Sequence, residues 1–246
     1  MKLLTDIGNS QIKIAQNDNQ KLLKILSFSI GDIEKFCKYV ATTYAKKGCG
    51  LFYSSVLGDK FNRKFKKNLK GIFITETQFK STKSLMTVKN CYYQPDKLGS
   101  DRWAQIVAAH KIFKKNTMIV SCGSAISIDY VTITGVHKGG LILCGAERYN
   151  NCFLDIHNLK NIKLRNNLNN NSNILQSNTL KQITTGYRVM ISSSINEIYS
   201  TLCQKGKPKP NLLITGSYSK IISRDLKIKC LVERYFVLKS LALIQG

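Results

Sequence analysis

The chain opens with apolar and polar residues that alternate as they do in short β-strands. Residues 2–7 and 11–16 follow this alternation, and Gly8-Asn9 between them is a dipeptide suited to a tight turn. Residues 21–29 can form a third strand. The pattern therefore predicts a β-meander at the start of the chain.

Helical spacing of apolar residues follows this meander. It predicts a helix over 33–44, and the apolar run at 51–56 predicts a buried strand. From 96 to 113, apolar residues recur at intervals of three and four, which predicts a long amphipathic helix. Asp101 and Arg102 fall in its first turn.

The second half of the chain repeats the opening pattern. Residues 117–120 and 125–133 are strand-like runs around a polar turn at 121–124, and a third apolar run covers 141–144. Two halves that each begin with a meander and a polar turn indicate an internally duplicated α/β fold.

The domain boundary is expected after the helix that ends near Phe113. The predicted domains are residues 1–114 and 115–246. In the second domain, the pattern predicts a long helix over 176–203, a strand over 212–215 and an apolar helix over 235–244.

The charge balance favours anionic partners. The 246 residues include 38 Lys and Arg against 14 Asp and Glu, which gives a formal net charge of +24. The lysines are dispersed, with no block of five and no interleaved aromatic residues of the kind that single-strand binders use for base stacking. We therefore expect no nucleic-acid partner.

The cysteines and apolar runs predict a cytoplasmic protein. The eight cysteines show no Cys-x-x-Cys pair and no metal-ligand spacing. No run approaches the ~18 apolar residues of a membrane span. Thr5, Asp6 and Asn9 interrupt the first apolar run, so we expect neither a signal peptide nor a membrane partner.

Two polar clusters carry the candidate chemistry. Residues 6–13 have the composition of a phosphate-holding β-turn, and Asp101 beside Arg102 offers a catalytic base next to an anion clamp. Together they suggest phosphoryl transfer to a small anionic substrate.

An ordered set of motifs resembles the type III pantothenate kinases, members of the acetate/sugar kinase, actin and heat-shock ATPase superfamily. The set comprises Asp-x-Gly-Asn-Ser-x-x-Lys at 6–13, Tyr92 with Pro95, Gly99-Ser-Asp-Arg-Trp103, Cys122-Gly-Ser-Ala125, Gly139-Gly140, and Asn178-Thr179 with Gly186. The resemblance implies ATP-dependent phosphorylation of pantothenate, the first step of coenzyme A biosynthesis. It also implies an actin-like ATPase fold, with two ribonuclease H-like domains around a cleft, in a homodimer.

The resemblance assigns ATP and phosphate binding to two turns. The first contains Asp6, Ile7, Gly8, Asn9, Ser10, Gln11, Ile12 and Lys13, and the second contains Gly123 and Ser124. Gly8 lets backbone amides approach phosphate oxygens, Lys13 neutralises a terminal phosphate, and Asp6 holds Mg²⁺ directly or through water. The alternative for the first turn is a polar hairpin with a solvated lysine.

The substrate residues implied by the resemblance are Tyr92, Gly99, Ser100, Asp101, Arg102 and Thr179. Asp101 accepts the proton of the pantothenate hydroxyl, and Arg102 binds the pantothenate carboxylate. Gly99 permits the bend that lets neighbouring side chains reach opposite ends of the substrate. The alternatives are an acid favoured by the helix dipole, a surface arginine and, for Thr179, a helix N-cap.

The chain departs from the family pattern at the second turn. Ser121 stands where the family has an aspartate that helps bind a monovalent cation, K⁺ or NH₄⁺. A hydroxyl is a weaker cation ligand, so this site is expected to be weak or replaced by a local positive charge. At 216–219 a bulkier turn replaces the paired glycines of the family beside the adenosine.

Two other functions stay open from the sequence. One is a catalytically weak relative that acts as a regulatory or accessory binding protein, and the other is a basic nucleic-acid-binding domain. Residues 145–200 are expected to form part of the dimer contact. His157 is expected at the surface, with completion of a neighbouring subunit's substrate pocket as the alternative, and the Asn-rich segment 166–173 is expected to be a loop.

Overall fold

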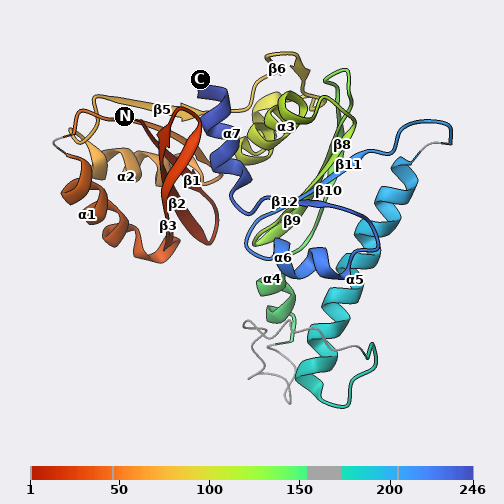
Figure 1. The fold of residues 1–246 in the computed structure, drawn as a ribbon. Coiled ribbons are helices and arrows are strands. Elements are labelled where there is room, and N and C mark those ends of the chain that lie inside the picture. The colour runs from red at the N-terminus through yellow and green to blue at the C-terminus, as the bar shows by residue number, and fades with distance from the viewer. Residues whose placement is uncertain (1, 46, 154–172, 204, 246) are drawn as a thin grey trace. The chain divides into compact units, whose positions relative to one another are not determined.

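A computed structural model describes residues 2–45, 47–153, 173–203 and 205–245 (Figure 1). His157 and residues 166–172 lie outside the described residues. Two compact units form: unit 1 contains Met1–Ile112, Thr134–His137 and Tyr235–Gly246, and unit 2 contains Phe113–Ile133 and Lys138–Arg234.

Unit 1 is built on a five-stranded sheet. Its strands are β1 (Lys2–Ile7), β2 (Gln11–Asp18), β3 (Lys21–Ser29), β4 (Gly50–Ser55) and β5 (Thr75–Phe79), in the order β3-β2-β1-β4-β5. The meander β1-β2-β3 is antiparallel, whereas β1, β4 and β5 run parallel. The predicted meander, the helix over 33–44 and the strand over 51–56 are confirmed, with shifts of one or two residues at their ends.

Helices α1 (Ile33–Tyr44), α2 (Asp59–Leu69) and α7 (Phe236–Gln245) pack against this sheet, and α3 (Ser100–Phe113) meets the end of β4 through Ser100. Side chains of α1 and α2 form one hydrophobic core with alternate residues of β1, β2 and β4, including Leu3, Ile7, Ile12, Phe36 and Phe65. Short elements complete unit 1: η1 (Ile30–Asp32), η2 (Pro95–Lys97) and the hairpin of β6 (Ser84–Leu85) with β7 (Val88–Lys89).

The C-terminal helix α7 packs against β1, β2, β3 and β4, so it belongs to unit 1. Phe236, Leu238 and Leu241 are buried there. The compact units therefore differ from the contiguous ranges 1–114 and 115–246, because this apolar helix returns to the sheet of the first half. As domain limits, those two ranges stay a prediction.

Unit 2 repeats the sheet topology of unit 1 (Figure 1). Its strands are β8 (Thr117–Cys122), β9 (Ala125–Val131), β10 (His137–Cys144), β11 (Asn211–Thr215) and β12 (Leu231–Val232), in the order β10-β9-β8-β11-β12. As in unit 1, the first strand is antiparallel to the second and parallel to the strand on its other side. The predicted duplication is confirmed.

Among its described residues, unit 2 has the helices α4 (Ala146–Asn151), α5 (Thr179–Leu202) and α6 (Ser219–Ile222), followed by η4 (Ser223–Asp225). Tyr187, Ile191 and Ile195 of α5 pack into one core with β8, β9 and β11. None of the helices in the described ranges combines the length and apolar character that a membrane span requires.

The helix predicted over 96–113 is the main correction at this level. It begins at Ser100, because Leu98 is extended and residues 95–97 form the separate 3₁₀ turn η2. It is also not amphipathic: every residue from Arg102 to Ala109 is buried. Arg102, for which a surface position was the alternative, and Gln105 are both buried.

Candidate functional site

Asp6 and Lys13 face each other across the hairpin of β1 and β2. They are register partners, and the Lys13 Nζ lies 3.4 Å from the Asp6 Oδ2. The Gly8 amide donates to the Gln11 carbonyl at 2.9 Å, which closes the turn and leaves Asn9 exposed at its tip. The hairpin thus carries a carboxylate and an ammonium group beside a turn of small polar residues.

The two isoleucines of this motif lie in the hydrophobic core. Ile7 and Ile12 are completely buried in the core between the sheet and helices α1 and α2. Their side chains therefore anchor the turn, and they can offer a ligand only their backbone. Ser10 is half-buried.

A pair of serines connects β4, the strand next to this hairpin, to the start of α3. Ser54, near the carboxyl end of β4, is the register partner of Asp6 on β1. Its Oγ lies 2.8 Å from the Oγ of Ser100, and the Ser100 hydroxyl also donates to the Ser55 carbonyl at 3.1 Å. All three serines are buried. This contact holds the first turn of α3, and with it Asp101, next to the end of the sheet that carries Asp6.

Asp101 is held in the first turn of α3. Its Oδ1 accepts a hydrogen bond from the Arg102 amide at 2.8 Å, and its carbonyl accepts one from the Gln105 Nε2 at 3.2 Å. A Cβ at Gly99 would lie 2.7 Å from the Asp101 Oδ1. Glycine therefore allows this carboxylate to fold back over the start of the helix.

Arg102 lies in a polar and aromatic environment. Its Nη1 donates to the Tyr92 hydroxyl at 3.1 Å, and its Cζ lies 5.9 Å from the centroid of the Tyr92 ring. The guanidinium is buried, so the alternative of an ordinary surface arginine is wrong. Tyr93 is fully exposed, and of the two neighbouring tyrosines it is Tyr92 that contacts the site.

His137 packs against the ring of Tyr92. The two rings stack with centroids 6.2 Å apart at an angle of 15°, and the His137 Nδ1 lies 3.5 Å from the Cys91 Sγ. His137 is completely buried. We did not predict this residue from the sequence; its position two residues before Gly139-Gly140 was the available signal.

The second predicted turn lies in unit 2. The Gly123 amide donates to the Ala125 carbonyl at 3.0 Å, and Gly145 approaches the Ser124 carbonyl so closely that a Cβ would collide with it. Ser121 pairs in register with Ser127 on β9 and Thr215 on β11. The register partners of Ser121 are thus hydroxyl residues, and no carboxylate stands at this position of β8.

Thr179 is exposed at the start of α5 in unit 2. The N-cap is Asn178, whose side chain accepts from the Lys181 amide at 3.2 Å. The helix-cap alternative for Thr179 is therefore wrong, because its neighbour fills that position.

The donor set suits magnesium better than a metal that needs a protein cage. Among the described residues, no three His, Cys, Asp or Glu side chains gather into a metal site. Mg²⁺ is usually held by one or two carboxylates together with substrate phosphates and water. Asp6, next to Lys13 and the glycine turn, fits that mode of binding.

Solved structures share this architecture. A Campylobacter jejuni protein described as a Baf family transcriptional activator superposes with a TM-score of 0.63 at 20% identity, covering 98% of this chain and 96% of that one. A Sinorhizobium meliloti protein described as a 2-dehydro-3-deoxygalactonokinase gives a TM-score of 0.56 at 10% identity, covering 99% and 98%. The fold is that of the actin-like ATPases and sugar kinases, as predicted.

Sequence comparison narrows this class to one family. The model of the type III pantothenate kinases matches residues 2–201. The type III pantothenate kinase of Sulfurihydrogenibium sp. (strain YO3AOP1) is 25% identical over 98% of each chain. That of Marinomonas sp. (strain MWYL1) is 31% identical over 58% of this chain and 56% of its own length. The chain belongs to the type III pantothenate kinase family.

Proposed function

We propose that this protein transfers the terminal phosphoryl group of ATP to the primary hydroxyl of pantothenate, the first step of coenzyme A biosynthesis. Family membership supports the reaction. The observation that carries the site is the Ser54–Ser100 contact of 2.8 Å, because it joins the strand beside Asp6 to the helix turn that holds Asp101.

Asp101 is proposed as the general base. Phosphoryl transfer asks a protein mainly to position the reactants and to stabilise charge, so the base needs proximity to the hydroxyl rather than an unusual acidity. The close approach at Gly99 and the Arg102 amide fix the orientation of this carboxylate before substrate arrives.

Arg102 and Tyr92 are proposed to hold the pantothenate carboxylate. A guanidinium can bind a carboxylate through two parallel hydrogen bonds. Its Nη1 is already oriented by the Tyr92 hydroxyl. Gly99, Ser100 and Thr179 are the remaining proposed substrate residues.

The hairpin turn is proposed to bind the phosphates of ATP. Lys13 can exchange its contact with Asp6 for a terminal phosphate, which leaves the carboxylate available to a cation. Magnesium bound with ATP would be held by Asp6, directly or through water, and would neutralise phosphate charge. Gly123 and Ser124 are proposed as a second phosphate-binding element.

A variant at Asp101 tests the reaction. Asp101→Asn keeps an oxygen that can accept from the Arg102 amide but cannot accept the proton of the alcohol. We expect kcat to fall by about 10²-fold or more, with little change in pantothenate binding. A coupled assay of ADP release measures turnover, and calorimetry measures binding.

Asp96→Asn is the matched control, because Asp96 is an exposed carboxylate in the preceding turn η2. We expect its turnover to equal that of the wild type. Equal turnover of Asp101→Asn and wild type would remove Asp101 from its proposed role. Pantothenate binding by a wild type without turnover would favour an accessory binding protein.

The monovalent cation requirement is proposed to be weak. Ser121 pairs in register with hydroxyl residues, and a hydroxyl attracts K⁺ less than a carboxylate does. We expect turnover in sodium buffer to change less than about twofold when potassium is added, and Ser121→Asp to gain a larger response. A strong, saturable potassium requirement of the wild type would contradict this proposal. The homodimer and the cytoplasmic location stay predictions.

A further inference from the structure

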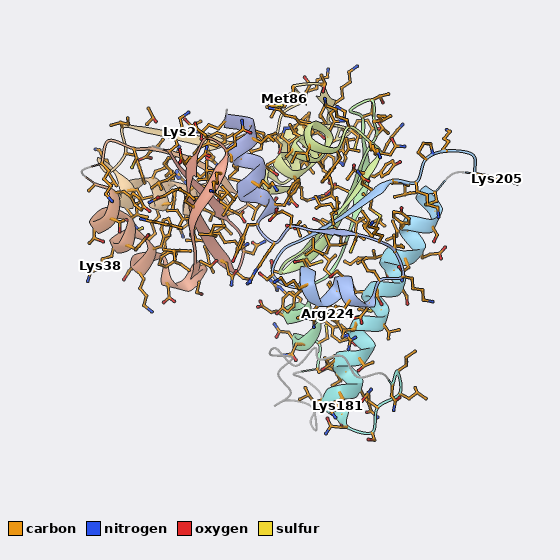
Figure 2. The ribbon with its side chains drawn as sticks, in the orientation of Figure 1. Lys2, Lys38, Met86, Lys181, Lys205 and Arg224 are labelled. Atoms are coloured by element: carbon orange, nitrogen blue, oxygen red, sulfur yellow. The ribbon has the colours of Figure 1, made fainter. Side chains whose placement is uncertain are left out.

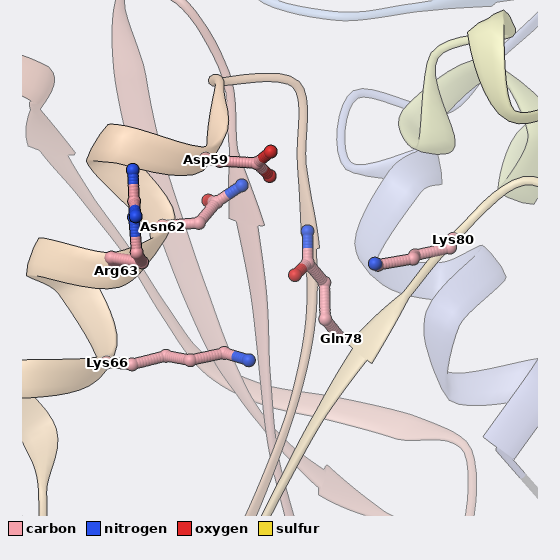
Figure 3. A pocket seen from close by; sticks show the side chains of 6 residues that line it. All are labelled: Asp59, Asn62, Arg63, Lys66, Gln78 and Lys80. Atoms are coloured by element: carbon pink, nitrogen blue, oxygen red, sulfur yellow. The ribbon is translucent and has the colours of Figure 1, made fainter.

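A basic pocket lies on unit 1 between helix α2 and the end of strand β5 (Figure 3). It has a volume of about 310 Å³ and is lined by Asp59, Asn62, Arg63, Lys66, Gln78 and Lys80. None of these residues belongs to the proposed transfer site. We refer to this set of six residues as the α2–β5 pocket.

The hydrogen-bonding groups of this pocket are mostly donors. Asn62 is committed to the protein, because its Nδ2 donates to the Leu57 carbonyl at 2.8 Å and its Oδ1 accepts from the Ser55 hydroxyl at 2.7 Å. The Gln78 Oε1 accepts a hydrogen bond from the Tyr53 hydroxyl at 3.4 Å. This contact holds the Gln78 side chain between α2 and Lys80, as Figure 3 shows.

The pocket carries three cations against one carboxylate. Figure 3 shows Lys66 of α2 and Lys80, which follows β5, extending from opposite sides toward Gln78. Within the described ranges, Arg63, Lys66 and Lys80 form no ion pair. Lys66 does act on the nearby Glu76: burial raises the pKa of this carboxyl, and the positive charge of Lys66 offsets part of that rise.

These groups favour a compact polyanion. Like charges that face one pocket repel each other, and an anion between them relieves that repulsion. Donors arrive from α2 on one side and from the end of β5 on the other, which suits the several oxygens of a phosphate better than one planar carboxylate. The volume lies at the lower end of the range for small-molecule sites, roughly 300–1,000 Å³.

We propose that the α2–β5 pocket is a second anion site, separate from the transfer site, that binds the phosphate groups of a small phosphorylated molecule. This inference goes beyond the proposed function and does not depend on it. The hydrogen bond from Ser55 to Asn62 places the pocket beside the strand end that anchors Ser100.

Nuclear magnetic resonance of ¹⁵N-labelled protein can test this site, with sodium tripolyphosphate as the probe at constant ionic strength. We expect the amides of Asn62 and Gln78 to shift and saturate, independently of Gly8 in the transfer site. The triple variant Arg63→Gln/Lys66→Gln/Lys80→Gln is expected to weaken the response of these two amides at least about tenfold. Lys13→Gln is expected to affect the response of Gly8 and leave that of Gln78 unchanged.

The matched control removes the same charge elsewhere on unit 1. Lys21, Lys38 and Lys111 are exposed, and their triple replacement by glutamine is expected to leave the pocket response intact. Asp59→Asn is expected to tighten binding at the pocket, since it removes the lining carboxylate.

Three outcomes would overturn the proposal. One is an equal loss in both triple variants, which would assign the response to the net charge of the chain. Another is a wild-type pocket that does not respond to tripolyphosphate or responds equally to succinate. The third is tighter and more salt-dependent binding of a single-stranded oligonucleotide at the same amides, which would identify a nucleic-acid surface.

Discussion

Arg102 shows at the scale of one residue how the fold changes the meaning of a charged side chain. A guanidinium that leaves water must find hydrogen-bond acceptors, because an unpaired buried charge is costly. The Tyr92 hydroxyl supplies one acceptor, and the ring of Tyr92 lies near the cation. A buried arginine held in this way would need little reorganisation to bind an anion, which fits its proposed role at the pantothenate carboxylate.

Removal of the Tyr92 hydroxyl tests this role. Tyr92→Phe keeps the ring that stacks on His137 but deletes the acceptor of the Arg102 Nη1. We expect KM for pantothenate to rise about 3- to 10-fold, with kcat changed less than about twofold, because one net hydrogen bond contributes about 0.5–1.5 kcal/mol. Steady-state kinetics over a range of pantothenate concentrations measures both constants.

Tyr93→Phe is the control for this variant, since Tyr93 is fully exposed one position further along the chain. Its KM is expected to equal that of the wild type. An equal rise in KM for both variants would show that Arg102 is positioned without the Tyr92 hydroxyl.

At the scale of elements, helix α5 is tied to the short helix η4 by an ion pair. The Arg188 Nε donates to the Asp225 Oδ2 at 2.7 Å, and the Nη2 donates to the Oδ1 in the same bidentate pair. The hydrogen bond to Asp225 raises the pKa of Arg188. Both side chains are largely shielded from water, so the pair connects α5 to the segment that follows strand β11.

Breaking this pair is expected to destabilise the fold. Arg188→Met leaves the Asp225 carboxylate without its cation, and we expect the free energy of unfolding to fall by about 2–3 kcal/mol. Urea unfolding at pH 7 measures the loss. The double variant Arg188→Met/Asp225→Asn is expected to recover part of the stability, because no unpaired charge remains. If the double variant loses as much stability as Arg188→Met and Asp225→Asn lose when their separate losses are added, the two residues act independently.

Helix α2 shows a limit of prediction at the same scale. Phe61, Phe65 and Leu69 face the sheet at helical spacing, yet basic residues fill most of the intervening positions. We did not predict α2 or the neighbouring strand β5 from the sequence. The α2–β5 pocket therefore emerged only from the structure.

At the scale of the whole molecule, a buried thiol makes the free energy of unfolding depend on pH. Burial raises the pKa of Cys122 from 9.0 to about 12. Above pH 9 the unfolded chain releases this proton while the folded chain retains it, so the unfolded state binds fewer protons. The free energy of unfolding must therefore fall as the pH rises toward 12.

Replacement of this thiol should reduce that pH dependence. We expect Cys122→Ala to lose stability at every pH, because it leaves a small cavity, but to have a slope between pH 9 and 10.5 that is shallower by about 1 kcal/mol per pH unit. Urea unfolding at several pH values measures the slope, and Cys152→Ala, at an exposed position, is the control. An unchanged slope in Cys122→Ala would mean that the buried thiol does not titrate as expected.

Much of the architecture was predictable because each half of the chain has the same simple alternation. The strands of both meanders, the helix α1 and the long helix α5 follow patterns that a local window of sequence contains. The start of α3 was misplaced, because the predicted helix included residues 96–99, whereas Pro95–Lys97 form η2 and α3 begins only at Ser100. Apolar spacing shows which residues are buried but defines the end of a helix poorly.

The candidate site was predictable where its residues are neighbours in the sequence. Asp6 with Lys13, and Asp101 with Arg102, stand out as polar groups beside apolar runs. His137 and Ser54 were missed, because each reaches the site from a strand whose own pattern gives no sign of it. Ser54 and Ser100, for example, are 46 residues apart in the sequence.

By itself, the sequence determined the two meanders, the helices α1 and α5, the duplication and the family motifs, because periodicity in these elements records which side is buried. The tertiary structure decided which side chains meet: Ser54 with Ser100, Tyr92 with Arg102 and His137, and the cations of the α2–β5 pocket. Such contacts depend on the order of strands in the sheet and on the packing of helices against it. A local pattern of apolar residues does not contain that information.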